Sequence, residues 1–137
     1  MDHELLKSQL ERHEGLRLHP YLDTVGKMTI GYGRNLDDNG ISKAEAAMML
    51  ESDIQNVVAD LEYMPTYKSL NPIRQTVICN MAYNMGIPTL MTFRKMWAAI
   101  GVEKWDVAAA EMMNSRWARQ VGQRAAELAT LMSRGRA

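Results

Sequence analysis

Residues 14–33 read EGLRLHPYLDTVGKMTIGYG, and this stretch decides which kind of fold the chain can adopt. Apolar residues alternate with more polar ones on both sides of Asp23-Thr24-Val25-Gly26, a segment with the composition of a tight turn. The alternating apolar positions are Leu16, Leu18, Met28, Ile30 and Tyr32. The pattern predicts a β-hairpin, with a short third strand near residues 34–36.

Helical periodicity dominates the rest of the chain. Leucines at helical spacing predict a short helix over residues 2–13 that ends at Glu14-Gly15. Ser42 followed by Glu45 is a capping box, and it begins a long helix that stops near Pro65. Further helices are predicted over 72–85, 90–100, 103–113 and 123–132. The expected fold class is therefore α+β, mostly α, with the sheet confined to the first 36 residues.

Composition limits the classes of protein to which the chain can belong. With 137 residues, 47% of them hydrophobic, it can bury the core of one domain over 1–137 and is too apolar to be disordered. Cys79 is the only cysteine, which excludes an intramolecular disulfide and a thiolate zinc cluster. No apolar run is long enough to span a membrane, and the opening Met1-Asp2-His3-Glu4 is unlike a secretory signal. We therefore expect synthesis in a reducing cytoplasm and no stable membrane insertion.

The net charge of zero hides a strong asymmetry between the two halves. Residues 1–62 carry 12 acidic and 6 basic side chains, a net charge of −6, and residues 63–137 carry 4 acidic and 10 basic ones, a net charge of +6. Such a dipole has two interpretations. It either steers the basic half towards an anionic cell surface, or it reflects electrostatic attraction between the two oppositely charged halves of the protein. The basic residues are scattered over several predicted helices, so a nucleic-acid partner is not expected.

Three polar residues of residues 14–33 are candidates for catalysis. Glu14 ends the first predicted helix, and Asp23 lies in the hairpin nine residues later. Glycoside hydrolysis needs two carboxyl groups in different roles, and Thr29 offers a hydroxyl that can hold a water molecule. Spacing alone leaves open the alternative that all three are ordinary surface groups.

The motifs of residues 14–33 resemble those of the phage T4-type lysozymes, the endolysins of glycoside hydrolase family 24. The resemblance continues in the family's order along nearly the whole chain. Its pieces are Glu14-Gly15-Leu16-Arg17-Leu18, Tyr21-Leu22-Asp23-Thr24, Thr29-Ile30-Gly31-Tyr32-Gly33, Ile41-Ser42-Lys43-Ala44-Glu45-Ala46, Asn80-Met81-Ala82-Tyr83-Asn84-Met85-Gly86, Lys104-Trp105-Asp106-Val107-Ala108-Ala109, Ser115-Arg116-Trp117 and Gln123-Arg124-Ala125. The ordered series is specific, whereas any one piece alone is weak.

The resemblance implies a muramidase that cuts the β-1,4 bond between N-acetylmuramic acid and N-acetylglucosamine. It implies a lysozyme-like fold with a small N-terminal sheet lobe, residues 14–62, joined by a long helix to a C-terminal helical lobe, residues 63–137. The N-terminal helix, residues 2–13, is then expected to pack on the C-terminal lobe. By position, Glu14 matches the family's general acid, Asp23 its second carboxylate and Thr29 its water-positioning threonine, which together imply an inverting displacement.

Four further residues are predicted to bind substrate or support the reaction: Tyr32, Tyr83, Asn84 and Arg124. Arg124 matches an arginine near the acid and is expected either to orient Glu14 or to hold the lobes together. Arg34 stands where the family usually has histidine, and we expect it to pair with an acidic neighbour. The segment before Ser42 is also shortened, so substrate contacts made there in the family are in doubt.

Other features favour structural roles. The three histidines lack metal-ligand spacing, so neither metal nor cofactor is expected. The methionines and the tryptophans Trp97, Trp105 and Trp117 are expected in the core, and Cys79 is expected as a small buried hydrophobe. The resemblance implies a monomer that binds peptidoglycan strands and reaches the wall after a separate protein permeabilises the membrane. A lytic transglycosylase and a non-catalytic peptidoglycan-binding module on the same fold are the alternatives.

Overall fold

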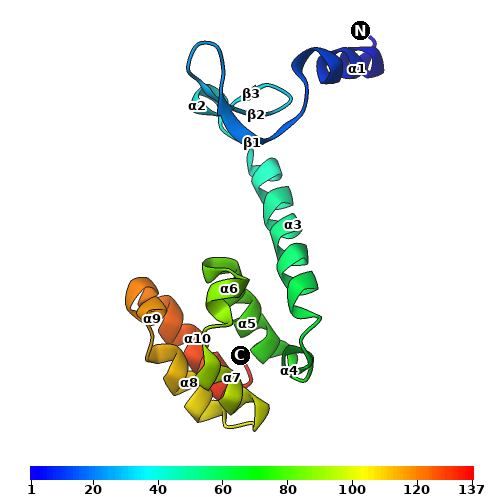
Figure 1. The fold of residues 1–137 in the computed structure, drawn as a ribbon. Coiled ribbons are helices and arrows are strands. Elements are labelled where there is room, and N and C mark those ends of the chain that lie inside the picture. Colours follow the sequence, from blue (N-terminus) through cyan, green and yellow to red (C-terminus); the bar gives the residue numbers. More distant parts are fainter. The chain divides into compact units, whose positions relative to one another are not determined.

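A computed structural model describes residues 1–137 and divides them into two compact units, Met1–Met48 and Met49–Ala137. The first unit contains helix α1 (His3–Glu14), a three-stranded sheet and the short helix α2 (Leu36–Asn39). The second unit is entirely helical (Figure 1). The predicted α+β fold, mostly helical with a small N-terminal sheet, is confirmed.

The sheet is antiparallel with the order β1-β2-β3. It consists of β1 (Arg17–Leu22), β2 (Met28–Gly31) and β3 (Arg34–Asn35). Tyr21 pairs with Thr29, and Thr29 pairs in turn with Asn35, so Thr29 lies on the central strand. The register of β1 shifts between Arg17 and Tyr21, which is the mark of a bulge. The hairpin and the third strand therefore form where the alternating pattern predicts them.

Helix α3 (Lys43–Leu61) begins with the predicted capping box. The Ser42 hydroxyl accepts the Glu45 amide hydrogen at 3.1 Å, and the Glu45 carboxylate accepts the Ser42 amide hydrogen at 2.8 Å. Two of the helix's first unpaired N–H groups are satisfied in this way. The boundary between the two units falls within this helix, between Met48 and Met49.

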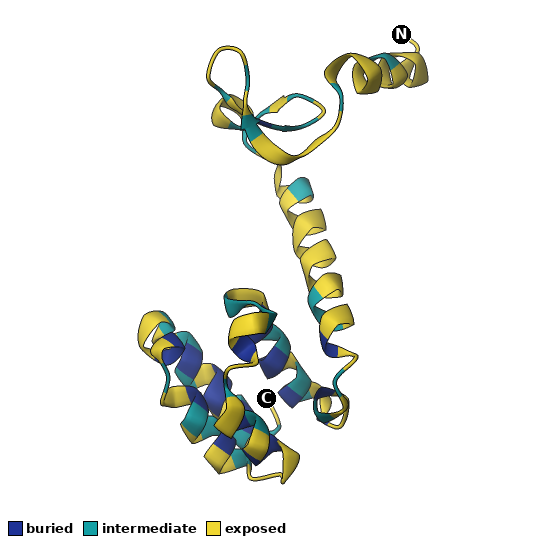
Figure 2. Ribbon diagram, in the orientation of Figure 1, coloured by how far each residue is buried: buried dark blue, intermediate teal, exposed yellow.

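The remaining helices all belong to the second unit. They are α4 (Pro65–Lys68), α5 (Pro72–Met85), α6 (Ile87–Leu90), α7 (Arg94–Gly101), α8 (Trp105–Met113), α9 (Arg116–Val121) and α10 (Gln123–Arg134). None of the helices is long and apolar enough to cross a membrane. Their apolar faces enclose one core, drawn in dark blue in Figure 2. Its largest fully buried side chains are Leu61, Val77, Ile78, Met81, Leu90, Met96, Ile100, Met112 and Met132.

One helix prediction is corrected by the structure, and one helix was missed. The helix predicted over 90–100 begins only at Arg94, because Leu90 ends α6 and the chain then turns, with the Thr92 hydroxyl donating to the Thr89 carbonyl at 2.6 Å. Helix α9 was not predicted, although Ser115 caps its start by accepting the Ala118 amide hydrogen at 3.0 Å. At six residues it is too short for periodicity to reveal it.

The prediction that methionines and tryptophans form the core is only partly right. Trp117 is buried, and Trp97 and Trp105 are half-buried against the core. However, Met48 and Met49 are 72% and 54% exposed. Cys79 is half-buried rather than buried, and its thiol lies 3.3 Å from the Tyr67 hydroxyl. Burial raises the pKa of Tyr67, so this phenol stays protonated and keeps a hydrogen bond with Cys79.

Candidate active site

Glu14 is the last residue of α1, and its side chain lies against the backbone of Gly33. Gly15 follows with a φ of +71°, a left-handed conformation that ends the helix and turns the chain towards β1. A Cβ atom added to Gly33 would lie 2.6 Å from the Glu14 Oε2 atom. Glu14, Tyr32 and Gly33 also line the same hollow, whose volume is about 540 Å³. Two predicted site residues, Glu14 and Tyr32, are thus brought together.

The Asp23 carboxylate is fixed within the hairpin turn. Its Oδ1 atom accepts the amide hydrogens of Val25 at 3.0 Å and of Lys27 at 2.8 Å. The Asp23 amide in turn donates to the Lys27 carbonyl at 2.9 Å. Oδ1 accepts both of these hydrogen bonds and Oδ2 accepts neither, so only one of the two carboxylate oxygens holds the turn.

Thr29 is the only buried residue of the first unit, with 3% of its surface exposed. Its hydroxyl donates to the Lys27 carbonyl at 2.9 Å. The hydroxyl's one hydrogen is therefore committed, and its oxygen can only accept a further hydrogen bond. Asp23 and Thr29 are both tied to the backbone of Lys27, which brings these two predicted residues into one hydrogen-bonded turn.

Side chains of helix α2 also bind the residues at the end of this turn. The Asp37 carboxylate accepts the Met28 amide hydrogen at 2.7 Å, and Lys27 forms an ion pair with Asp38 at 3.1 Å. Asn35 caps the helix by accepting the Asp38 amide hydrogen at 3.0 Å. Sequence reasoning assigned no role to Lys27, Asp37 or Asp38. Spacing gives no sign that the Asp37 side chain accepts a hydrogen bond from the backbone of β2.

Arg34 pairs with Glu45, as the sequence predicts for a residue that replaces the usual histidine. Two parallel contacts join the guanidinium to the carboxylate, at 2.7 and 2.5 Å, and a third reaches the Gly40 carbonyl at 3.3 Å. The hydrogen bond from Arg34, together with those from Ser42, lowers the pKa of Glu45 to about 2. The same pair raises the pKa of Arg34. This contact ties the strand that follows Gly33 to the start of α3.

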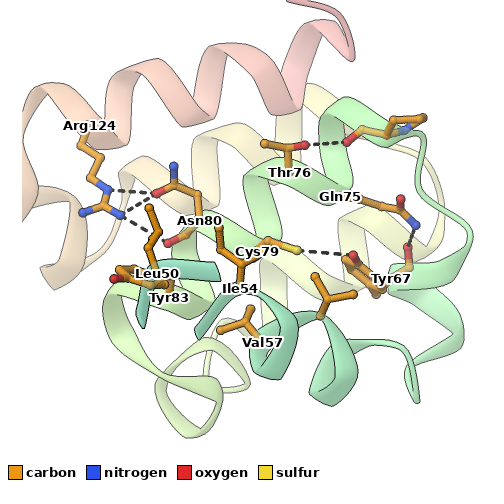
Figure 3. Close-up of a pocket in the computed structure, with 12 residues that line it drawn as sticks. Leu50, Ile54, Val57, Tyr67, Gln75, Thr76, Cys79, Asn80, Tyr83 and Arg124 are labelled. Carbon is orange, nitrogen blue, oxygen red and sulfur yellow. Dashed lines mark hydrogen bonds between the residues drawn. The ribbon is translucent and has the colours of Figure 1, made fainter. Parts of the chain in front are cut away.

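The second unit holds the other three predicted residues. Arg124 donates to the Asn80 side-chain oxygen at 3.0 and 2.7 Å, which links α10 to α5. Arg124 and the half-exposed Tyr83 line a mainly apolar hollow of about 480 Å³ (Figure 3). Asn84 turns elsewhere, because its side-chain oxygen accepts the Trp117 indole hydrogen at 2.7 Å. Asn80, which sequence reasoning quoted only within a motif, is the partner that fixes Arg124.

No group of three or more histidine, cysteine, aspartate or glutamate side chains is arranged to hold a metal ion. The chemistry that the site offers is that of carboxyl groups and hydroxyls.

Comparison with known proteins identifies the class. The chain is 30% identical to "Probable T4-type lysozyme 1" of Dictyostelium discoideum, over 95% of this chain and 94% of that protein. It is 31% identical to the "Endolysin" of Acyrthosiphon pisum secondary endosymbiont phage 1, over 84% and 80%. It is 27% identical to the "Pre-baseplate central spike protein Gp5" of Enterobacteria phage T4, over 95% of this chain and 28% of that protein.

These relatives and the α+β fold with its carboxylate-bearing hairpin define a lysozyme-type glycoside hydrolase that acts on peptidoglycan. Within that class the chain belongs to the phage lysozyme family, whose model matches residues 11–137. The matched range includes the whole hairpin and every residue predicted for the site.

Proposed function

We propose that the enzyme is a muramidase that hydrolyses the β-1,4 bond between N-acetylmuramic acid and N-acetylglucosamine, with Glu14 as general acid and Asp23 as general base. The observation that carries this proposal is the fixed Asp23 carboxylate, held through Oδ1 with Oδ2 left over. A general base must be held in place and still keep a free lone pair for the proton of water. Glu14 belongs to the same compact unit, at the end of α1.

Thr29 completes the proposed binding of water. Its hydroxyl hydrogen is used by the Lys27 carbonyl, so a water molecule at this oxygen must donate a hydrogen. Such a water gives its second hydrogen to Asp23 Oδ2 and directs a lone pair at the sugar carbon. As Glu14 protonates the leaving oxygen, Asp23 accepts the proton from the attacking water, and the configuration at the anomeric carbon is inverted. This displacement needs the two carboxyl groups roughly 6.5–9.5 Å apart, to leave room for the water.

Four residues are proposed to bind or orient the glycan. Tyr32 and Tyr83 are both 48% exposed, so each offers an aromatic face to a sugar ring. Asn84 uses its side-chain oxygen on Trp117, which leaves its amide hydrogens for substrate oxygens. Arg124, fixed by Asn80, is proposed to orient Glu14, and its alternative role is to hold α5 and α10 together.

The lobe organisation is also part of the proposal: residues 14–62 and 63–137 form the lobes, and the helix over residues 2–13 packs on the C-terminal lobe. The support is that Leu5, Leu6 and Leu10 are 55%, 40% and 44% exposed, an apolar face that needs a cover. If it is covered, Leu6→Asp lowers the thermal midpoint by several degrees, whereas Lys7→Asp on the same helix changes it little. Equal small effects would contradict the packing.

We propose that the protein serves host lysis as a monomeric endolysin that works with a separate membrane-permeabilising protein. The similarity to a phage endolysin supports this role. In cells that make the enzyme, lysis should begin only when a permeabilising protein or agent is added. Lysis without one would contradict the dependence on a partner.

The deciding experiment is mass spectrometry of the soluble products from purified peptidoglycan digested in heavy-oxygen water. The wild type should yield reducing muropeptides that carry one heavy oxygen, and Glu14→Gln and Asp23→Asn should each lower the rate at least about 100-fold. Glu4→Gln and Asp53→Asn remove exposed carboxylates from helices and are the matched controls. Anhydro products, lighter by one water, would instead identify a lytic transglycosylase, and binding without release would identify a binding module.

A further inference from the structure

The carboxyl group of Glu14 occupies the space that a side chain at position 33 would fill. A Cβ atom on Gly33 would lie 2.6 Å from Oε2, 3.1 Å from Cδ and 3.4 Å from Cγ of Glu14. Three successive atoms of the acid thus pack on the backbone of one glycine. We propose that Gly33 is a positioning residue that seats the carboxyl group of Glu14, an inference that rests on the proposed role of Glu14 as general acid.

Neighbouring glycines show that the contact is separate from the backbone conformation. Gly31, two residues earlier, has a φ of +70° and Gly33 has a φ of +77°, so both adopt a conformation that disfavours other residues. A Cβ on Gly31 would meet nothing within 4 Å. Both positions therefore suit glycine for conformational reasons, but only Gly33 suits it because of Glu14. Gly31 is a matched control that the chain itself provides.

The backbone of Gly33 is held in place by its neighbours, so it can fix the position of a side chain that packs on it. It is followed directly by β3, where Arg34 is bound by Glu45 at 2.7 and 2.5 Å and pairs with Ile30 of β2. The Glu14 side chain, in contrast, belongs to the last residue of a helix and has several rotatable bonds, so it can change rotamer. When the two are forced apart, the side chain moves and the backbone stays. A Cβ at position 33 therefore displaces the acid more than it disturbs the fold.

Displacement of this acid affects the chemical step more than binding. Proton transfer to the leaving oxygen requires hydrogen-bond distance, and a misplacement of 1 Å can cost roughly 100-fold in rate. The glycan itself is proposed to be bound by other residues, among them Tyr32 and Tyr83. The expected pattern for Gly33→Ala is accordingly a fall in kcat with little change in KM, with kcat calculated per mole of folded enzyme, because unfolded enzyme also lowers the apparent kcat.

The kinetic test compares Gly33→Ala with Gly31→Ala on purified peptidoglycan. Gly33→Ala should lower kcat by about 10- to 100-fold and change KM by less than about twofold. Gly31→Ala should change kcat by no more than about threefold, while both variants lose a similar few degrees of thermal midpoint from the strained backbone. Equal kcat losses in the two variants, or a Gly33→Ala loss that lies mainly in KM, would overturn the proposal.

A spectroscopic test needs no variant at position 33 and no activity. The Cα–H resonances of Gly33 should differ between the wild type and Glu14→Gln at a single pH, because the substituted side chain packs on this backbone. The resonances of Gly31 should coincide in the two proteins. Coinciding Gly33 resonances would overturn the proposed contact, even if Gly33→Ala fails to fold.

Glu14→Gln separates this inference from the proposed function. If Glu14→Gln keeps full activity, the role of Glu14 as acid is wrong, whatever the resonances of Gly33 do. If Glu14→Gln is inactive but Gly33→Ala behaves like Gly31→Ala, the proposed mechanism stands and the proposed positioning role of Gly33 is wrong. Inactivity of Glu14→Gln with a selective kcat loss in Gly33→Ala supports both.

Discussion

Nineteen apolar residues are buried in Met49–Ala137, whereas Thr29 is the one buried residue of Met1–Met48 (Figure 2). The second unit is thus organised around a hydrophobic core. The first unit is organised by hydrogen bonds: Asp23 to two amides of its own turn, Asp37 to the Met28 amide, and Arg34 to Glu45. The residues proposed for acid and base chemistry lie in the region held by polar contacts.

This difference suits the task of each unit. The hydrophobic effect is large in total but non-directional. It therefore holds helices together but does not set the orientation of a single carboxylate. Hydrogen bonds contribute less each, but they are directional and fix an oxygen atom to within a narrow range. The structure therefore predicts that stability responds most to changes in the core of the second unit and that the proposed acid and base chemistry responds most to changes in the first.

The largest expected effect is a cavity in the core of the second unit. Ile78 is fully buried, so Ile78→Ala should lower the free energy of unfolding by about 2–5 kcal/mol. Leu18, on β1, is 74% exposed, and Leu18→Ala should change it by no more than about 0.5 kcal/mol. Urea denaturation measures both. A Leu18→Ala cost as large as that of Ile78→Ala would show that the first unit also depends on apolar packing.

A somewhat smaller loss of stability is expected on substitution of Arg74, the one buried cation of the second unit. Arg74 is 8% exposed, donates to the carbonyls of Met132 and Ser133 at 2.7 and 3.0 Å, and stacks 3.8 Å from the Trp105 ring centre. Burial lowers the pKa of Arg74, but these partners suit a guanidinium. Arg74→Ala should cost about 2–3 kcal/mol. Arg74→Lys should recover less than half of that loss, because an ammonium group cannot reproduce the contacts of a planar guanidinium with the ring and the two carbonyls. Urea denaturation measures both variants. Full recovery in Arg74→Lys would mean that only the positive charge matters.

The sequence predicts the elements of both units better than it predicts their contacts. Alternation and the capping box of Ser42 and Glu45 gave the hairpin and α3, because these signals are local. The short helices α4, α6 and α9 were missed, since one turn of helix is too short to show a period.

The candidate site shows the same difference between local signals and contacts. The ordered motifs predict Glu14, Asp23 and Thr29, whose catalytic roles stay predictions, and the predicted pairing of Arg34 with an acidic neighbour is confirmed. The link of Asp37 to Met28, nine residues away in sequence, and the packing of Glu14 on Gly33 were not predicted. Both depend on how a side chain crosses from one element to another, and no spacing rule encodes that direction.

A third prediction concerns the hydrogen bonds that support the hairpin turn carrying Asp23. Asp37→Ala removes the acceptor of the Met28 amide and should cost about 1 kcal/mol of stability, while kcat falls about tenfold because the turn that carries Asp23 loosens. Lys27→Ala removes only the exposed ion pair with Asp38 and keeps the Lys27 backbone that holds Asp23 and Thr29. Its cost should be no more than about 0.5 kcal/mol, with kcat nearly unchanged. Equal kcat losses would contradict a special role for Asp37.

The smallest expected effect is a change in pH dependence at Arg34. The pKa of Glu45 is about 2 in the folded protein, below its unfolded value of about 4.3, so the stability from this carboxylate is present above pH 4.3 and is lost as the pH falls towards 2. Arg34 itself does not titrate between pH 5 and 9. Arg34→His replaces it with a group whose pKa is raised by Glu45 above about 6.5.

Stability from the substituted pair should then be present below pH 6.5 and lost as the pH rises through that raised pKa. The thermal midpoint of Arg34→His should fall further below that of the wild type at pH 8.5 than at pH 5.5. Adding Glu45→Gln to both proteins should remove the pH dependence of this difference. Since the pair is exposed, the effect is small, and a difference that stays constant with pH would mean that Arg34 stabilises the start of α3 by geometry rather than by charge.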